Sequence, residues 1–392
     1  MEFRLFSSSY AKASEDKVPP FLGALKSCGK YEKINFVMYQ PKYSITNKIL
    51  KNVGIIEGCR EVIDNAPLVP AWEARFREEA VIRTVHYGTH LEGNELSFTE
   101  AKDVLAGREV IGRDRDVQEV LNYREVLKYI DSVGERKSEE FEYTKKMIKK
   151  IHKLTTKKIL PPERCGKFRS TQVVIRNSET GEIVYKPPPA VEVPYLMESF
   201  IRWMNSEEAK EVISILRAGI THYVSAAIHP FVEGNGRTAR AFATLVLFRE
   251  GYDIKKFFSL EEYFDKNCGG YYEVLATVSD KDKDINNRDL TEWLEFFTEA
   301  LAAELQRVKE KVRKLSVDLR LKRKMGEQIA LSERQMKMVE YLEETGEMRM
   351  TEAKKLIPMV SEDTLLRDFK DLMKKGIVKK KGSTKAAKYV MA

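Results

Sequence analysis

The chain has 392 residues, of which 43% are hydrophobic and 33% are charged, a balance that excludes wholesale disorder. This length exceeds one ordinary domain and predicts two or three. The sequence has no run of about 18 apolar residues and no apolar stretch at its amino terminus, so we expect neither a membrane-spanning helix nor a secretory signal. The four cysteines, Cys28, Cys59, Cys165 and Cys268, form no CxxC pair, which argues against disulfides and cysteine zinc sites and favours the reduced cytoplasm.

The net charge of +8 is concentrated near the carboxyl terminus. Residues 301–392 carry 23 Lys/Arg and 14 Asp/Glu, a net charge of +9, whereas 1–300 are close to neutral. A basic block on a small terminal module indicates a polyanionic partner, and nucleic acid is favoured over a membrane. A solvated, lysine-rich surface explains the composition equally well.

The first 300 residues predict a mainly helical fold. Ser97 and Glu100 form a capping box, which predicts a helix start at Ser97. The expected helices cover 46–53, 70–90, 97 to 105 or 106, 116–132, 138–154 and 191–205. The runs Val173–Ile175 and Ile183–Tyr185 are β-branched or aromatic, and the turn residues between them predict a hairpin. A charged helical connector is expected over 300–330.

The last 60 or so residues predict a separate module. One helix should begin at Ser332, a short one should follow near Thr351, and a third should be capped by Ser361. The third helix is expected to turn Leu365, Leu366, Phe369, Leu372 and Met373 inward and to stop at Gly376. Two short strands around a basic turn then complete the order of a winged helix-turn-helix, whose third helix enters a DNA major groove.

The segment His229–Arg240, with the sequence HPFVEGNGRTAR, lies between two strongly apolar helices. Upstream, Val212, Leu216, Ile220, Val224 and Ile228 recur every four residues; downstream, the helix is apolar nearly all round and should be central. Pro230 is expected to end the first helix, and Asn235 to cap the next.

This segment carries the groups that a phosphate chemistry needs. A Gly-Asn-Gly loop that opens a helix presents free N–H groups to an anion, and Arg237 and Arg240 add fixed positive charge. Glu233 is a hard oxygen ligand suited to Mg²⁺, and His229 can take a proton from a hydroxyl. The pattern predicts transfer of a phosphate-containing group to a hydroxyl, and the missing Walker lysine excludes a P-loop NTPase.

Every defined position of this segment matches the signature His-Pro-Phe-x-Asp/Glu-Gly-Asn-Gly-Arg-x-x-Arg, so the sequence resembles the Fic family. Gly166–Arg169, Pro187–Pro189 and the pair Tyr271-Tyr272 also resemble family features. The resemblance implies a Fic helical core with a β-hairpin flap. It also implies transfer of AMP from ATP to a protein hydroxyl, with release of pyrophosphate.

The resemblance further implies a role for each site residue. His229 would be the general base toward a Tyr, Thr or Ser hydroxyl, and Glu233 would hold Mg²⁺ between the α- and β-phosphates. The nucleotide and its phosphates would contact Phe231, Gly234, Asn235, Gly236, Arg237, Arg240, Tyr271 and Tyr272. The flap, at Val173, Val174 and Ile175, would dock the target segment by strand addition.

Gly88–Asn94 resembles the inhibitory helix of many Fic proteins, Ser/Thr-x-x-x-Glu-Gly/Asn. Glu92 and Gly93 match this pattern, whereas Gly88 stands where Ser or Thr is usual. The resemblance implies that Glu92 pairs with Arg240 and occupies the place of the γ-phosphate, which would keep the enzyme inhibited.

We expect four segments: a helical region with the inhibitory helix at 1–110, the catalytic core at 111–300, a connector at 301–330 and a winged helix-turn-helix at 331–392. The leading hypothesis is an autoinhibited protein adenylyltransferase that uses ATP and Mg²⁺ on a target protein. One alternative is removal of AMP in the same site, with Glu92 positioning a water. Another is a DNA-binding regulator whose Fic core senses nucleotide. DNA is the expected partner of the terminal module, no membrane partner is expected, and a homodimer stays open.

Overall fold

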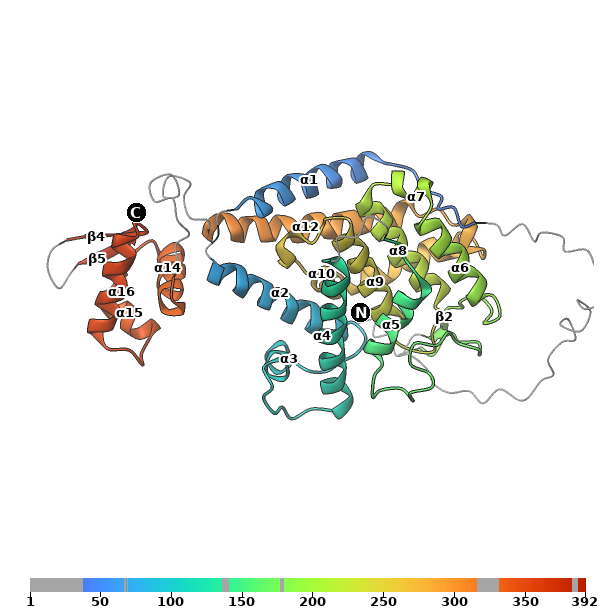
Figure 1. Ribbon diagram of the computed structural model, residues 1–392, viewed down its shortest axis with the longest axis horizontal. Helices are drawn as coiled ribbons and strands as arrows, with labels where there is room; N and C mark the ends of the chain where they lie inside the picture. Colours follow the sequence, from blue (N-terminus) through green and yellow to red (C-terminus); the bar gives the residue numbers. More distant parts are fainter. Residues whose placement is uncertain are drawn as a thin grey trace, which may run out of the picture. The chain divides into compact units, whose positions relative to one another are not determined.

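The computed structural model describes residues 38–66, 68, 70–135, 141–176, 180–315, 331–382 and 387–392, and this part of the chain is mainly helical (Figure 1). It divides into two compact units. The first includes Arg83–Tyr252 and Glu261–Glu299, and the second includes Lys51–Ile82, Asp253–Leu260 and Ala300–Ala392. The signature segment and Glu92 both belong to the first unit. The four-segment division of the sequence stays a prediction.

The helices before residue 316 follow the expected order, with some shifted ends. They are α1 (Asn47–Asp64), α2 (Pro70–His90), α3 (Phe98–Leu105), α4 (Asp114–Gly134), α5 (Lys145–Thr155), α6 (Val193–Met204), α7 (Glu207–Glu211), α8 (Ser214–Ile228), α9 (Asn235–Arg249), α10 (Leu260–Lys266), α11 (Cys268–Asp280) and α12 (Thr291–Leu315), with 3₁₀ turns η2 (Ile254–Lys256) and η3 (Ile285–Asn287). The capping box of Ser97 and Glu100 is confirmed at the start of α3.

Two helix boundaries differ from the sequence predictions. α1 continues well past residue 53, because Ile56, Cys59 and Ile63 recur on one face and are fully buried. α5 begins at Lys145 rather than at 138. Before it, Thr144 is extended, and the backbone of Tyr143 bonds to the Asn205 side chain: its N–H donates to Asn205 Oδ1 and its carbonyl accepts from Asn205 Nδ2, each at 2.8 Å. Residues 136–140 lie outside the described residues.

The central position of the helix after the signature is confirmed. α9 packs against α4, α5 and α8, and its residues from Arg237 to Leu247 are all buried (Figure 1). This explains why the segment is apolar nearly all round: a helix covered on every side has no solvent face to keep polar. The stripe on the preceding helix begins later than expected, because Val212 is the C-cap of α7 and α8 starts at Ser214.

The predicted hairpin is present but shorter. β1 (Ile175–Arg176) pairs antiparallel with β2 (Ile183–Tyr185), with Ile175 opposite Tyr185 and a register shift at Arg176. Val173 and Val174 precede the strand instead of belonging to it. Most of the predicted turn, 177–179, lies outside the described residues.

The carboxyl-terminal segment contains α14 (Glu333–Thr345), β3 (Met348–Arg349), α15 (Met350–Leu356), α16 (Glu362–Lys374), β4 (Val378–Lys381) and β5 (Lys388–Met391). Ser332 and Ser361 cap α14 and α16 as predicted. The strands form a sheet in the order β3-β5-β4, and the sequence did not predict β3. Leu366 was expected inside but is 38% exposed, because it lies about a quarter turn around α16 from the face that buries Leu365, Phe369 and Leu372. Residues 316–330 of the predicted connector and 383–386 lie outside the described residues.

The described helices include none that combines the length and the apolar character needed to cross a membrane.

Candidate functional site

The signature segment forms a closed loop between α8 and α9. His229 ends α8 in the left-handed region (φ 50°, ψ 59°), and Gly234 takes φ 76° immediately before α9. The prediction that Asn235 caps α9 is wrong, because its side chain turns back into the loop. Asn235 Oδ1 accepts from Phe231 N at 2.8 Å, and Asn235 Nδ2 donates to the Phe231 carbonyl at 2.9 Å. Within the described part of the chain no side chain caps α9, so the N–H groups of its first turn lack a side-chain partner.

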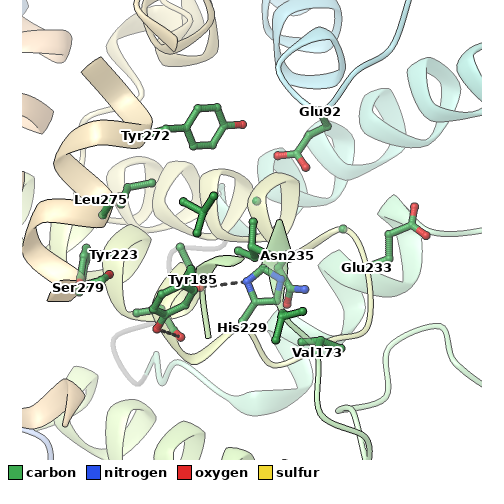
Figure 2. Close-up of a pocket in the computed structure, with 18 of the residues that line it drawn as sticks. Glu92, Val173, Tyr185, Tyr223, His229, Glu233, Asn235, Tyr272, Leu275 and Ser279 are labelled. Atoms are coloured by element: carbon green, nitrogen blue, oxygen red, sulfur yellow. Dashed lines mark hydrogen bonds between the residues drawn. The ribbon is translucent and has the colours of Figure 1, made fainter. Parts of the chain in front are cut away.

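A cavity opens over this loop. Its lining includes Glu92; Val173, Val174, Ile175 and Tyr185 at the hairpin; Tyr223 of α8; Tyr271, Tyr272, Leu275 and Ser279 of α11; and His229, Glu233, Gly234, Asn235, Gly236 and Arg240 of the signature. Figure 2 shows Glu92 and Tyr272 on one side of the cavity and His229 and Val173 on the other. Residues from distant parts of the first unit therefore meet around the signature.

His229 is prepared to accept a proton. Burial lowers the pKa of its imidazole to about 4, and the nearby Arg169 acts in the same direction. The ring is therefore neutral at physiological pH. Its Nδ1 lies 3.3 Å from the Ala226 carbonyl, which can only accept, so Nδ1 carries the proton and Nε2 is the free basic nitrogen.

Arg240 and Glu92 form an ion pair in the cavity wall. Arg240 Nη2 donates to Glu92 Oε1 and to the Gly88 carbonyl, both at 2.9 Å. Burial alone would raise the pKa of Glu92, but the attraction of Arg240 and Arg237 outweighs it and holds that pKa below its usual value. Arg240 Nη1 is buried and has no hydrogen-bond partner in the described part of the chain. A donor is therefore left over for an anion in the cavity.

Arg237 does not line the cavity, although the sequence places it beside Arg240. Its Nη1 lies 2.9 Å from Glu119 Oε1 of α4, and both side chains are almost fully buried. Glu119 also accepts from Asn94 Nδ2 at 3.1 Å, which connects it to the turn that carries Glu92. Arg237 is thus paired with the Glu119 carboxylate, which no pattern in the sequence identified.

Glu233 also has a cationic partner from α4. Its carboxylate accepts from Arg115 Nη2 and lies 3.9 Å from Arg237 Nη2. The guanidinium groups of Arg115, Arg237 and Arg240 face the carboxylates of Glu92, Glu119 and Glu233. The formal charge of these six groups is zero, so the site as built offers a polyanion no net positive charge.

The residues present are compatible with Mg²⁺ but do not form a complete metal site. Among the described residues, no three His, Cys, Asp or Glu side chains are grouped to hold a metal ion. Mg²⁺ commonly takes one or two protein carboxylates and completes its shell with waters and substrate phosphates. The single carboxylate of Glu233, at the edge of the cavity, fits that kind of site (Figure 2).

The aromatic residues divide into two groups. Tyr271 and Tyr272 line the cavity; the hydroxyl of Tyr272 donates to the Leu91 carbonyl at 3.1 Å, and that of Tyr271 lies 2.9 Å from His222 Nε2. Phe231, which was expected at the nucleotide, does not line the cavity. Its fully buried ring stacks on His152 with centroids 3.7 Å apart, so its side chain belongs to the support beneath the loop.

The three flap residues Val173, Val174 and Ile175 all line the cavity, as does Val184 from the facing strand. The hairpin is tied to the signature by Arg169, a residue whose role the sequence did not reveal. Arg169 Nε donates to the His229 carbonyl at 2.8 Å, and Nη2 donates to the Pro188 carbonyl at 2.5 Å. In the sequence, the motif Gly166–Arg169 was the signal for this role. The partners of Arg169 are backbone carbonyls, however, which a pattern of side chains does not reveal.

The helical core thus brings the uncapped start of α9 and a neutral histidine to one cavity. In comparison with known proteins, residues 142–247 match the model of the Fic/DOC family. The protein adenylyltransferase Fic of Drosophila grimshawi is 31% identical over 180 residues, which are 45% of this chain and 35% of that protein. Its Drosophila melanogaster counterpart is 32% identical over the same length, covering 34% of that protein. The chain thus spans only about a third of these relatives, whose names describe a transferase activity.

Solved structures agree on the fold. A Fic family protein from Desulfovibrio desulfuricans matches with a TM-score of 0.61 at 22% identity, over 90% of this chain and 98% of that chain. Fic-1 from C. elegans matches with a TM-score of 0.54 at 22% identity, over 67% of this chain and 71% of that one. The chain therefore shares the fold of these Fic proteins.

Proposed function

We propose that this protein is a protein adenylyltransferase, which transfers AMP from ATP to a Tyr, Thr or Ser hydroxyl of a target protein. The observation that carries the proposal is the arrangement of His229 and α9 around one cavity. A neutral histidine with a free Nε2 lies beside an uncapped helix N-terminus and a buried arginine donor. A base and an anion site sharing one cavity suit attack of a hydroxyl on a phosphate.

The proposed reaction balances with these residues. His229 Nε2 accepts the proton of the target hydroxyl, the hydroxyl oxygen bonds to the α-phosphorus, and pyrophosphate leaves with the electrons of the broken P–O bond. The N–H groups at the start of α9 and the guanidinium of Arg240 bind the phosphates and orient them. Magnesium held by Glu233 would neutralise phosphate charge.

We propose that Glu92 keeps this site inactive. Its carboxylate forms an ion pair with Arg240 and brings the net formal charge of the six-group cluster to zero. Removal of Glu92 leaves one net positive charge among the remaining groups and frees a bidentate phosphate donor. ATP could then bind with its phosphates seated on α9.

Removal of AMP from a modified target is the second candidate in the same site. It is favoured by the ionised state of Glu92, whose pKa is held low while its side chain keeps 21% exposure toward the cavity. An ionised carboxylate beside the cavity could orient a water toward the phosphate.

We also propose that 331–392 form a winged helix-turn-helix that binds DNA mainly through its hairpin. The element order supports this, and Lys379, Lys380 and Lys381 on β4 are all exposed. α16 contains Glu362, Asp363, Asp368 and Asp371 against three basic residues, so its charge gives little attraction to phosphates. Reduced cytoplasm is the proposed compartment, since Cys59, Cys165 and Cys268 are all free.

Radiolabelled ATP and Mg²⁺ with purified protein and a cell lysate test the proposal. Glu92→Gly should label protein strongly, and Glu92→Gly with His229→Ala should bind ATP without labelling. Absence of labelling by Glu92→Gly at saturating ATP would contradict adenylyl transfer. Loss of label from a modified target on addition of wild type, but not of Glu92→Gly, would favour AMP removal.

A further inference from the structure

His152, on α5, holds the signature loop from beneath. Its side chain is fully buried and does not line the cavity. Nε2 lies 2.9 Å from the Glu233 carbonyl, and Nδ1 lies 2.8 Å from the Gly166 nitrogen. The ring also stacks on Phe231 with an interplanar angle of 3°. Both ring nitrogens and one face of His152 therefore contact the signature loop or the Gly166 turn.

The two hydrogen bonds fix the tautomer of His152. The Gly166 N–H can only donate, so Nδ1 accepts, and the proton resides on Nε2, which donates to the Glu233 carbonyl. A protonated ring would lose the bond to Gly166. Burial prevents this: it lowers the pKa of His152 to about 4, although the bond to Glu233 acts in the opposite direction.

The carbonyl that His152 holds belongs to the peptide that leads into α9. That peptide joins Glu233 to Gly234, whose φ of 76° creates the turn. The end of α5 packs closely against the turn on this side, since a Cβ at Gly234 would lie 3.0 Å from Thr156 Cγ2 and 3.9 Å from His152 Cδ2. The hydrogen bond to this carbonyl opposes rotation of the peptide and thereby orients its other end, the N–H of Gly234 at the entry to α9.

We propose that His152 is a positioning residue for nucleotide binding, which orients the phosphate-binding turn of the signature without touching the ligand. The inference rests on the proposed function, because it assumes that the turn at Gly234 receives the phosphates of ATP. It predicts that His152 acts on the affinity for nucleotide rather than on proton transfer at His229.

Two substitutions of His152 separate the effect of its hydrogen bonds from the effect of its packing. His152→Phe keeps an aromatic ring to stack on Phe231 but has neither donor nor acceptor. His152→Gln keeps one donor and one acceptor, as the neutral imidazole does. Tyr143→Phe is the matched control, because it removes one hydrogen bond, from the Tyr143 hydroxyl to Glu250 at 3.0 Å, at a residue that does not line the cavity.

The decisive measurement is calorimetric affinity for a non-hydrolysable ATP analogue with Mg²⁺, in a Glu92→Gly, His229→Ala background that cannot turn over. We expect His152→Phe to raise the Kd by about tenfold or more, His152→Gln to recover most of the affinity, and Tyr143→Phe to leave it unchanged. Thermal unfolding of each variant checks that it is folded. In Glu92→Gly enzyme, His152→Phe should raise KM for ATP more than it lowers kcat.

An unchanged Kd for folded His152→Phe would overturn the inference, as would equal losses in His152→Phe and Tyr143→Phe. If His152→Phe does not fold, an affinity of His152→Gln more than about tenfold below the background protein would overturn it too. Failure of the proposed function has a different signature: Glu92→Gly binds the analogue but labels nothing, and the comparison of Kd values still decides the role of His152.

Discussion

Arg240 binds both the Glu92 side chain and the backbone of α2 through the same nitrogen atom. Arg240 Nη2 donates both to the Glu92 carboxylate and to the Gly88 carbonyl, each at 2.9 Å. The arginine is 2% exposed and the glutamate 21%. Loss of the carboxylate therefore leaves the carbonyl bond in place, so Arg240 keeps its position at the cavity while the N–H that Glu92 held is released.

Arg240→Ala should not reproduce the gain in labelling expected of Glu92→Gly. It breaks the same ion pair but also removes the donor that would hold a phosphate, and it leaves the half-buried Glu92 carboxylate without its main partner. Combined with Glu92→Gly, we expect it to lower labelling by at least about tenfold relative to Glu92→Gly alone. Initial rates with radiolabelled ATP measure this, and labelling by Arg240→Ala equal to that of Glu92→Gly would contradict the assigned role.

Gly88→Ser should activate the enzyme, although it brings the sequence closer to the usual inhibitory pattern. A Cβ at Gly88 would lie 2.6 Å from Tyr123 Cε1 and 3.2 Å from Glu261 Cγ, too close for either side chain to stay in place. The displaced helix should weaken both bonds of Arg240 and lower the free energy of unfolding by about 1–3 kcal/mol. Gly58→Ser is the control, since a Cβ there meets nothing within 4 Å. If Gly88→Ser had the stability and the labelling of the wild type, the prediction would be wrong, because the close contact with Tyr123 would then be easily relieved.

Labelling by Glu92→Gly should persist to lower pH than an ordinary histidine base allows. The base acts when neutral, and burial lowers the pKa of His229 to about 4, so activity is retained above that value and lost as the pH falls through it. Between about pH 7 and about pH 5.5 we expect less than about a twofold fall in rate, whereas an unperturbed histidine would lose about tenfold. Rates at saturating ATP and Mg²⁺ test this, with analogue binding over the same range as the control for nucleotide ionisation. A midpoint near pH 6.5 would contradict a half-buried base with a lowered pKa.

Which residues of the site could be predicted from the sequence depends on how far along the chain their partners lie. The signature is continuous, so spacing and resemblance could identify His229 and Arg240 from the sequence alone. The partners of Arg237 and Glu233 come from α4, more than a hundred residues earlier, and no local pattern marks Arg115 or Glu119 as facing the signature. Long-range pairing depends on how helices pack, which periodicity does not specify.

The side chains of two residues inside the signature point in directions that their residue types do not indicate. Asn235 suits a helix cap by residue type, but its amide bonds both backbone groups of Phe231 and closes the loop instead. Phe231 packs beneath the loop because His152 offers it a flat partner. The sequence gives the composition of such a loop, whereas the direction of each side chain depends on the backbone turns at His229 and Gly234.

Arg115→Ala should lower the Mg²⁺ concentration needed for half-maximal labelling in a Glu92→Gly background. Arg115 donates to the Glu233 carboxylate, so a cation and this guanidinium compete for one ligand. Removing the arginine frees the carboxylate and leaves one less positive charge to repel the metal. Lys128→Ala is the matched control on α4, since Lys128 pairs with Glu125 and not with the signature. Titration with Mg²⁺, or with Mn²⁺ followed by its magnetic resonance signal, measures the shift. An unchanged requirement in both variants would mean that Glu233 and Arg115 do not compete with the metal.

Replacement of Lys379, Lys380 and Lys381 by alanine should reduce DNA binding without altering transfer by Glu92→Gly. All three lysines are exposed on β4, while the neighbouring α16 carries more acidic than basic residues. If each lysine neutralises one phosphate, the slope of log affinity against log salt should fall by about 2 to 3 in magnitude. The control replaces Lys102, Lys128 and Lys210, which are exposed on helices of the first unit and remove the same charge. Fluorescence anisotropy with a labelled duplex at several salt concentrations gives the slopes. Equal loss of affinity in the two triple variants would indicate attraction to overall charge and would remove the DNA-binding role from the hairpin.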